Sequence, residues 1–337
     1  MKRLIWIGTL LVITSGTAFA QTKKERLKEK QEEMRAKVDS TLSARYFNTK
    51  YDTMYIGRPV QPLTLKVRTS ISGNKFEVKS HGQKGGCGTL RSDHKATLDL
   101  GASWRGLTAG VALNPAKLRG ENKDFEFNLN AYSNRYGIDI VYQDTRTLSG
   151  NVKYGDISGY LGKEILRMKM VNVNGFYAFN GRRFSYPAAF AQSYIQKRSA
   201  GSWLVGFSYM GGSMKTTNHQ AMEGLSKYRI YVGHFGVGGG YGYNWTTFRG
   251  RLLMHLSTLP TIVIGNYNNV RVNDERYDMD TKFPDLILTE RGAIVYNFSH
   301  KWFVAGSVVV TNSLLGDDEV DINFLKWRGQ LCLGMRL

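Results

Sequence analysis

The sequence lacks the features of a helical membrane protein and of several common enzyme classes. After residues 1–20 it has no apolar run of about 18 residues or more, which excludes membrane-spanning helices. It also has no Walker loop and no Gly-x-Ser-x-Gly, His-Glu-x-x-His or Cys-x-x-Cys motif. The motifs therefore predict no cofactor and no metal site.

Cysteine and proline are both scarce, at 2 and 6 residues in 337. Cys87 lies in a glycine-rich stretch and Cys332 near the last residue, a spacing that indicates neither a metal site nor a redox pair. We interpret both as unpaired thiols, although an exported protein would permit a bond between them. Few prolines and many tyrosines, phenylalanines and glycines favour strands over helices.

Acidic residues are too few to balance the basic ones, and the formal net charge is +19. We find no nucleic-acid-binding motif, so we expect no nucleic-acid partner. Two interpretations of the excess remain open. It attracts phosphates of lipopolysaccharide or an anionic solute in a lumen, or it consists of solvated loops and of side chains that reach lipid headgroups.

The beginning of the chain predicts export. Lys2 and Arg3 precede a short apolar stretch, and Ala18-Phe19-Ala20 has the pattern of a signal-peptidase site. We therefore expect residues 1–20 to be a cleaved signal peptide. Residues 21–50 are highly charged and predict a partly helical extension in the periplasm. The remaining domain is residues 51–337.

From about residue 63 onwards, apolar and polar residues alternate with a period of two. The pattern is clearest in residues 63–71, 97–104, 125–131, 136–143, 248–257 and 301–310. Such segments form sheets with one apolar and one polar face. Their length of about ten residues and their aromatic ends fit strands that cross a bilayer. The sequence predicts an all-β, antiparallel transmembrane β-barrel of about twelve strands, with ten to fourteen compatible.

The last residues continue this alternation. Leu331, Leu333, Met335 and Leu337 share one face, and Cys332 and Arg336 share the other. We expect this strand to pair with the first one, with its leucines toward lipid and Cys332 and Arg336 inward. Residues 104–107 and 299–301 predict short periplasmic turns, and the polar segments near 72–93, 144–168, 211–226 and 265–286 predict long outer loops.

Alternation stops at residues 180–203, where Pro187 is followed by helix-compatible residues. We predict a short helix or plug near 187–198, in the mouth or lumen of the barrel. It is either a structural plug or a polar, cationic site for an anionic group. The candidate ligand-binding or plug residues are Arg182, Arg183, Tyr186, Gln192, Tyr194, Lys197 and Arg198.

One enzyme hypothesis rests on His255 and Ser257, which lie two residues apart on one strand face. Outer-membrane phospholipases use such a pair together with an asparagine that orients the histidine, for which Asn244 and Asn297 are candidates. The chemistry would be attack of the serine hydroxyl on a lipid ester, with histidine as the base. The pair shares its face with the expected lumen, which lipid does not reach, so our first expectation is that the protein is not an enzyme.

Several segments resemble one family. Residues 183–190 and 192–202 are similar to the signature of DUF4421, a Bacteroidetes family of unknown function. Residues 51–56, 239–245 and 253–257 are similar to other blocks of the family, in the same order. The resemblance implies an outer-membrane barrel in a Bacteroides-like bacterium, and it implies no activity.

The sequence thus predicts a monomeric outer-membrane barrel of a Gram-negative bacterium. Its expected partners are outer-membrane lipid, lipopolysaccharide and the barrel assembly machinery. The expected role is structural or ligand-binding at the cell envelope. The alternatives are a channel for a small anionic solute and a lipid-ester hydrolase that uses His255 and Ser257.

Overall fold

The computed structural model describes residues 26–38, 40–41, 43–44, 50–81, 85–104, 107–115, 119–120, 123–217, 228–272, 275–278, 285–316 and 320–337. The chain divides into two units, Met1–Thr49 and Lys50–Leu337. In the first unit, residues 26–38 form an exposed helix. The predicted signal peptide, residues 1–20, lies outside the described residues. No helix among the described residues is both long and apolar enough to cross a membrane.

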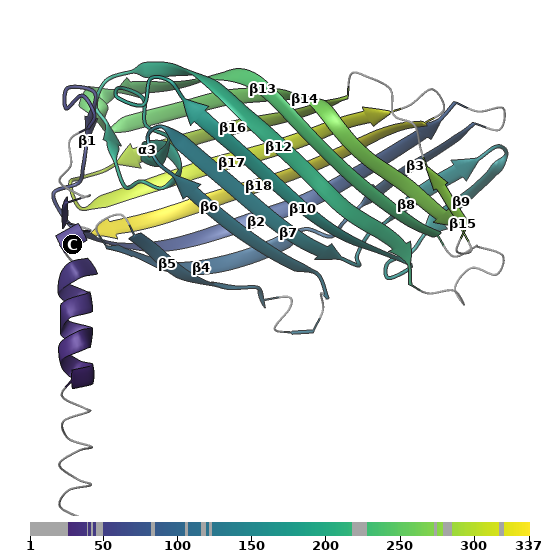
Figure 1. Ribbon diagram of the computed structural model, residues 1–337, viewed down its shortest axis with the longest axis horizontal. Helices are drawn as coiled ribbons and strands as arrows, with labels where there is room; N and C mark the ends of the chain where they lie inside the picture. Colours follow the sequence, from purple (N-terminus) through teal and green to yellow (C-terminus); the bar gives the residue numbers. More distant parts are fainter. Residues whose placement is uncertain are drawn as a thin grey trace, which may run out of the picture. The chain divides into compact units, whose positions relative to one another are not determined.

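The second unit is a curled antiparallel sheet, and twelve of its described strands follow one another around the wall (Figure 1). In chain order these are β2 (Leu63–Ser80), β4 (Lys95–Trp104), β5 (Leu107–Leu113), β6 (Phe125–Tyr132), β7 (Tyr136–Thr145), β10 (Leu166–Ala178), β12 (Ala200–Thr216), β13 (Tyr228–Thr247), β14 (Leu252–Val272), β16 (Leu286–Asn297), β17 (Trp302–Gly316) and β18 (Val320–Arg336). The predicted all-β barrel of about twelve strands is confirmed.

Shorter elements extend this wall at both ends. At one end lie β3 (Gly86–Arg91), β8 (Ser149–Tyr154), β9 (Ile157–Leu161) and β15 (Glu275–Asp278). At the other lie the helix α3 (Tyr186–Phe190), the 3₁₀ turn η1 (Phe248–Gly250) and a separate pair formed by β1 (Ile56–Gly57) and β11 (Ile195–Gln196). We call these the hairpin end and the plug end (Figure 1).

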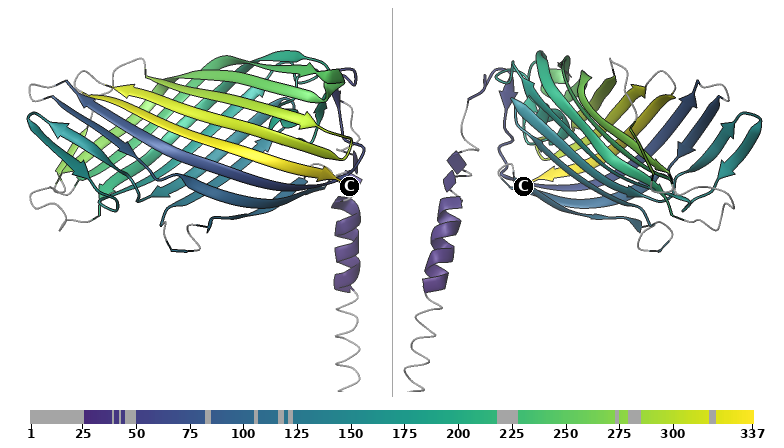
Figure 2. Two further views of the ribbon diagram at one scale, coloured as in Figure 1. Left: turned by 180° about the vertical axis from the view of Figure 1, so that it is seen from behind. Right: turned by 45° about the vertical axis from the view of Figure 1, so that its right-hand side comes forward.

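The expected pairing of the last strand with the first is present. β18 runs antiparallel to β2 from Val320↔Ser80 to Arg336↔Thr64, and Figure 2 shows the two strands side by side. The backbone of Leu337 continues the ladder, because its N–H donates to the carbonyl of Leu63 at 2.8 Å. Leu331 and Leu333 are exposed, and Cys332 and Arg336 are buried, as predicted.

In the described part of the chain the strand order ends at β5 on one side and β6 on the other, and no backbone ladder joins them. Side chains bridge this seam from within. Glu126 on β6 accepts a hydrogen bond from Ser72 on β2 at 3.2 Å. The ammonium groups of Lys95 and Lys326 each lie 3.9 Å from a carboxylate oxygen of Glu126. At the hairpin end the wall continues through the pairing of β3 with β8.

The two faces of the wall differ as the alternation predicts. The outer face carries a band of exposed apolar side chains, with tryptophans near the plug end, such as Trp203, Trp245 and Trp302. The inner face carries most of the buried polar and charged side chains, such as Asn172 and Arg291. A sheet that is apolar outside and polar inside is the pattern of a membrane barrel.

One irregularity changes which residues of β14 point outward. The register between β13 and β14 shifts between Phe235↔Gly265 and Gly236↔Val263, so Ile264 has no partner on β13. This is a β-bulge, which inserts one extra residue into one strand. Ile264 and Gly265 are consequently both exposed. Beyond them the register places Tyr267 and Arg271 opposite Gly233 and Arg229, so the odd-numbered residues of β14 take the outward side.

Two local predictions are corrected by the structure. Much of the sequence expected as long outer loops is strand: residues 72–80 belong to β2, residues 86–91 form β3, and residues 265–272 belong to β14. The helix in the interrupting segment is shorter than expected, because Gln192 adopts a left-handed backbone with φ of 50°. Lys197 and Arg198 follow β11 rather than a helix.

Candidate functional site

The segment between β10 and β12 folds into the lumen at the plug end. Ser185 caps α3, since its hydroxyl accepts a hydrogen bond from the backbone N–H of Ala188, and Pro187 occupies the first turn, where no N–H is needed. Tyr186, Pro187, Ala188 and Ala189 are all buried. We call residues 179–199 the plug segment. The helix packs against β14, β16 and β17.

The inner wall beside α3 carries a chain of hydrogen bonds from three strand residues. Asn244 and His255 are directly opposite each other on β13 and β14, and Ser257 follows on the same face of β14. His255 Nδ1 lies 2.7 Å from Asn244 Oδ1, and His255 Nε2 lies 3.0 Å from Ser257 Oγ. The hydroxyl of Tyr186 donates to Ser257 Oγ at 2.7 Å. Tyr186 of the plug segment thus extends this series of hydrogen bonds.

The network fixes the tautomer of His255. The amide nitrogen of Asn244 donates to the plug, so its oxygen faces the imidazole and accepts from Nδ1–H. Nε2 is then an acceptor, and Ser257 donates its proton to it. This order, an amide oxygen, an imidazole and a hydroxyl, is that of a nucleophilic serine with its base and orienting group. Asn297, the other asparagine considered, instead contacts Arg251 and Arg336.

Asn244 also holds the plug. Its amide nitrogen donates to the carbonyl of Ser185 at 3.1 Å and to the side-chain oxygen of Gln196 at 3.0 Å. Gln196 in turn donates to the carbonyls of Arg183 at 2.6 Å and Arg198 at 2.9 Å. Because these groups are buried, each lost partner would leave an unsatisfied polar atom. The network therefore fixes a single position of the plug.

Aromatic side chains from the plug enclose His255. The ring centroids of Phe184, Tyr186 and Phe190 lie 5.9, 4.8 and 5.0 Å from that of the imidazole. His255 and Ser257 are 4% and 3% exposed, so bulk solvent does not reach them while the plug is seated. Burial raises the pKa of the Tyr186 hydroxyl above its ordinary value, which keeps it protonated and able to donate.

A charged pair lies next to the hydroxyl of Ser257, deeper in the lumen. Arg291, opposite Ser257 on β16, donates to Asp139 Oδ2 at 2.7 Å, and the hydroxyl of Tyr132 donates to the same carboxylate. The guanidinium carbon of Arg291 lies 5.4 Å from the ring of Phe176. Among the described residues, Nε and Nη1 of Arg291 have no partner within hydrogen-bond distance.

The structure separates the predicted plug residues into two groups. The buried members are Tyr186 and Gln192, and the exposed members are Arg182, Arg183, Lys197 and Arg198, with Tyr194 half-buried. The cations therefore do not converge on Tyr186. Arg183 lies 3.4 Å from Asp52, Lys197 donates to the carbonyl of Thr53, and Arg58 packs on the ring of Tyr194. These contacts tie the plug segment to residues 52–58.

Some residues of the site were missed from the sequence. The sequence predicts Gln196 only as part of a helix, and it gives no direct indication of the buried pair of Arg291 and Asp139. The alternation of β16 and β7 places both on the inner face, which is a usable signal. The two residues are 152 positions apart in the sequence, and neither strand alone predicts that they meet.

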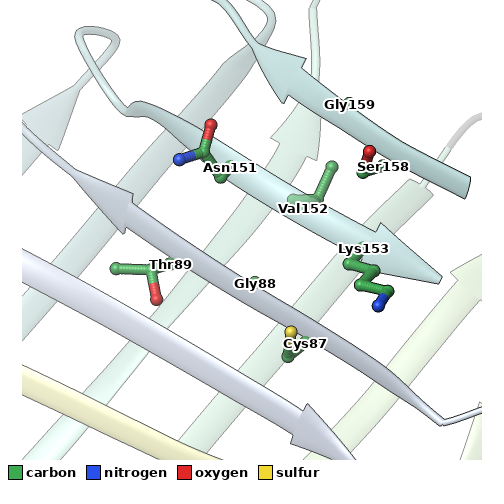
Figure 3. A pocket seen from close by; sticks show the side chains of 8 residues that line it. All are labelled: Cys87, Gly88, Thr89, Asn151, Val152, Lys153, Ser158 and Gly159. Carbon is green, nitrogen blue, oxygen red and sulfur yellow. The ribbon is translucent and has the colours of Figure 1, made fainter.

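Outside the plug network, the described residues give few further candidates for a functional site. They contain no group of three or more His, Cys, Asp or Glu side chains placed to hold a metal ion. An open hollow of about 450 Å³ lies on β3, β8 and β9 (Figure 3). Cys87, Thr89, Asn151 and Lys153 line it, without a histidine or a carboxylate. Cys87 and Cys332 are both free thiols, as interpreted from the sequence.

Comparisons with known proteins give a family and a set of similar structures. No curated protein matches the chain. Among solved structures, the outer membrane protease OmpT from Escherichia coli is 8% identical, with a TM-score of 0.46, over 86% of this chain and 100% of that one. The translocator domain of the autotransporter NalP from Neisseria meningitidis is 9% identical, with a TM-score of 0.30, over 95% and 99%.

The outer membrane protein OprG from Pseudomonas aeruginosa is 12% identical, with a TM-score of 0.29, over 82% of this chain and 97% of that one. A family model matches much more specifically. It covers residues 50–336, which is the whole barrel unit apart from its last residue. The chain belongs to the DUF4421 family, a domain of unknown function.

Proposed function

We propose that the protein is an outer-membrane β-barrel closed by its own plug segment, with a structural or ligand-binding role at the cell envelope. The observation that carries this proposal is the buried network in which Tyr186 donates to Ser257 and Asn244 donates to the plug backbone. A segment that only rested at the rim would not need such a network. The exported, outer-membrane placement is supported by the predicted signal peptide and by the exposed apolar band on the wall.

The lumen is also filled at the hairpin end. Nine buried apolar side chains meet there, among them Met170 on β10 and Phe324 on β18, which lie on opposite sides of the wall. An open pore for a small anionic solute would require both the plug and this cluster to move. The structure therefore favours a closed barrel over the channel alternative.

Conductance measurements separate these two roles. Purified full-length protein is inserted into planar bilayers of phosphatidylcholine, and we expect no stable current steps. Insertion is checked independently by co-flotation of the protein with the same lipid. Regular steps in the wild-type protein would contradict the closed barrel and support the channel.

A second candidate function, a lipid-ester hydrolase, is favoured by one observation, the hydrogen-bonded series Asn244, His255 and Ser257. Ser257 would attack an ester carbonyl carbon, and its proton would pass to His255 and then to the leaving alcohol. Water would then release the acid from the acyl-enzyme. Since Tyr186 contacts Ser257, catalysis would require the plug to withdraw.

This candidate is tested with short-chain and phospholipid esters. Wild-type protein is compared with Ser257→Ala, His255→Ala and the control Ser299→Ala, whose hydroxyl lies in the turn between β16 and β17. Turnover by the wild type and the control that both site variants lose would support the hydrolase. Absence of turnover in wild-type protein and in a variant lacking residues 184–200 would exclude it.

A further inference from the structure

A row of cations crosses four neighbouring strands on the outer face at the hairpin end. Lys215 on β12 is directly opposite Arg229 on β13, Arg229 is opposite Arg271 on β14, and Arg271 is opposite Arg276 on β15. Directly opposite residues point to the same side of a sheet. Figure 1 shows these strands running side by side, with β15 at the end away from α3. We call Lys215, Arg229 and Arg271 the cation row.

The cation row points away from the lumen. Met214, next to Lys215, packs against the apolar cluster inside the barrel, so Lys215 faces outward. On β14 the bulge at Ile264 turns Arg271 to the same side. Arg271 lies 5.8 Å from the ring of Tyr231, and Arg229 donates to the hydroxyl of Tyr231 at 3.4 Å.

Such a row is unfavourable by itself. Like charges placed directly opposite each other destabilise a sheet. Arg167, which extends the row on β10, is neutralised by an ion pair with Asp144. Lys215, Arg229 and Arg271 form no ion pair with any residue that the structure describes. An anion from outside the chain would therefore offset the repulsion within the cation row.

The position of the row along the strands indicates which anion. On β12 the outward residues from Trp203 through Val205 and Phe207 to Tyr209 are exposed and apolar or aromatic. Lys215 follows six residues after Tyr209. At about 3.3 Å per residue and a tilt of about 40°, Lys215 lies roughly 30 Å from Trp203 along the membrane normal. Measured from Trp203, an apolar band of the usual height of about 25 Å ends about 5 Å before Lys215, which places the cation row at the headgroup level.

We propose that the cation row binds the phosphate groups of lipid headgroups in the leaflet at the hairpin end. This inference rests on the proposed membrane placement. Lysine and arginine form strong, charge-assisted hydrogen bonds with phosphate, and the spacing of about 5 Å between neighbouring strands lets adjacent cations bind one phosphate or two linked phosphates. The exposed rings of Tyr209, Phe235 and Tyr267 lie below the row and pack against the acyl and sugar portion of the same lipid.

The test uses full-length protein in lauryl maltoside and compares lipids dissolved in the same detergent. The probes are diphosphorylated lipid A, phosphatidylglycerol, phosphatidylcholine and inorganic phosphate, and binding is measured by the rise in Tm. The row variant is Lys215→Gln, Arg229→Gln, Arg271→Gln. A matched control, Lys50→Gln, Arg251→Gln, Lys301→Gln, removes the same charge from exposed positions outside the row.

We expect lipid A to stabilise the wild type and the control at similar concentrations, and the row variant to need at least about tenfold more. Without lipid and at low ionic strength, the row variant should melt at or above the wild-type Tm, because the like-charge repulsion is gone. This result also shows that the variant is folded. An equal response to phosphatidylglycerol supports binding of lipid phosphate in general.

Two results would overturn the proposal. One is a row variant that responds to lipid A as the wild type does, and the other is stabilisation by inorganic phosphate at the same phosphate concentration as the lipids. Incorporation of the wild-type protein into phosphatidylcholine nanodiscs is measured in parallel. Incorporation without any preference for phosphorylated lipid would contradict the cation row while leaving the membrane placement intact.

Discussion

The two ends of the lumen are closed by different kinds of contact. At the plug end, buried polar groups such as Asn244, His255 and Ser257 are joined by hydrogen bonds to a separate segment of the chain. At the hairpin end, apolar side chains that belong mostly to the wall strands meet each other, and several are methionines, such as Met168 and Met210.

This difference has energetic consequences. A hydrogen-bonded closure specifies one position, because a displaced partner leaves a buried donor or acceptor unsatisfied. An apolar closure rich in methionine tolerates small changes in shape, since the unbranched side chain fills irregular space. We therefore expect the plug end to behave as a two-state seal and the hairpin end as an adaptable one.

The largest expected effect comes from removing the plug. Cys332 is 5% exposed and packs with Ala188 and Ala189 of the plug, so it reports on this seal. In a Cys87→Ser background, deletion of residues 184–200 should raise the rate of Cys332 labelling by a hydrophilic maleimide more than about tenfold. A Cys332→Ala version controls for labelling elsewhere. Equal labelling with and without the plug would show that the segment does not seal this end.

The next effect is expected at the apolar end. Phe324→Ala leaves a cavity in the cluster with Met170 and Met210, and should lower the free energy of unfolding by about 3–5 kcal/mol. Met210→Leu conserves volume and should cost less than about 1.5 kcal/mol. Reversible urea unfolding in detergent, followed by tryptophan fluorescence, measures both. Cys332 should stay protected in each variant, and its exposure would mean that the two seals are coupled.

A smaller effect is expected from the polar network. Asn244→Leu leaves His255, Gln196 and the carbonyl of Ser185 without their partner, which should cost about 1–3 kcal/mol and increase Cys332 labelling. The matched control is Asn151→Leu, an exposed amide in the hollow at the hairpin end. If Asn244→Leu labelled no faster than this control, the network would not be what holds the plug.

The smallest effect is expected from pH. The Tyr186 pKa is raised by burial, so its neutral, donating form is favoured in the folded protein. Its contribution to stability is complete below the ordinary tyrosine pKa of about 10 and is lost only as pH rises through the higher folded value. After correction for thiol ionisation with a model thiol, Cys332 labelling should stay constant from about pH 7 to 9. A release of the plug within that range would mean that another group controls it.

Alternation predicted the wall well because a bilayer imposes a strict contrast between its faces. The inward positions of Cys332, Arg336, His255 and Ser257 followed directly from it. The same rule failed beyond residue 72 on β2, where the strand continues but its outer face no longer requires apolar residues. A strand that extends beyond the membrane loses the pattern that identifies it.

The plug was located by an interruption of the alternation, but its contacts could not be predicted. Pro187 marked the start of α3 to within one residue, because the helix begins at Tyr186. The left-handed backbone at Gln192, which ends the helical part, has no clear signal because glutamine is a good helix former. The meeting of Tyr186 with Ser257 depends on how far the segment enters the lumen, which local sequence does not determine.

The bulge on β14 changes which alternate residues of the strand face outward. Before Ile264 the even-numbered residues of β14 face outward, and after it the odd-numbered ones do. A ladder without the bulge, in which Ile264 paired with Phe235, would turn Tyr267 and Arg271 into the lumen among the methionines. One unpaired residue therefore determines whether Tyr267 and Arg271 face the lipid or the lumen.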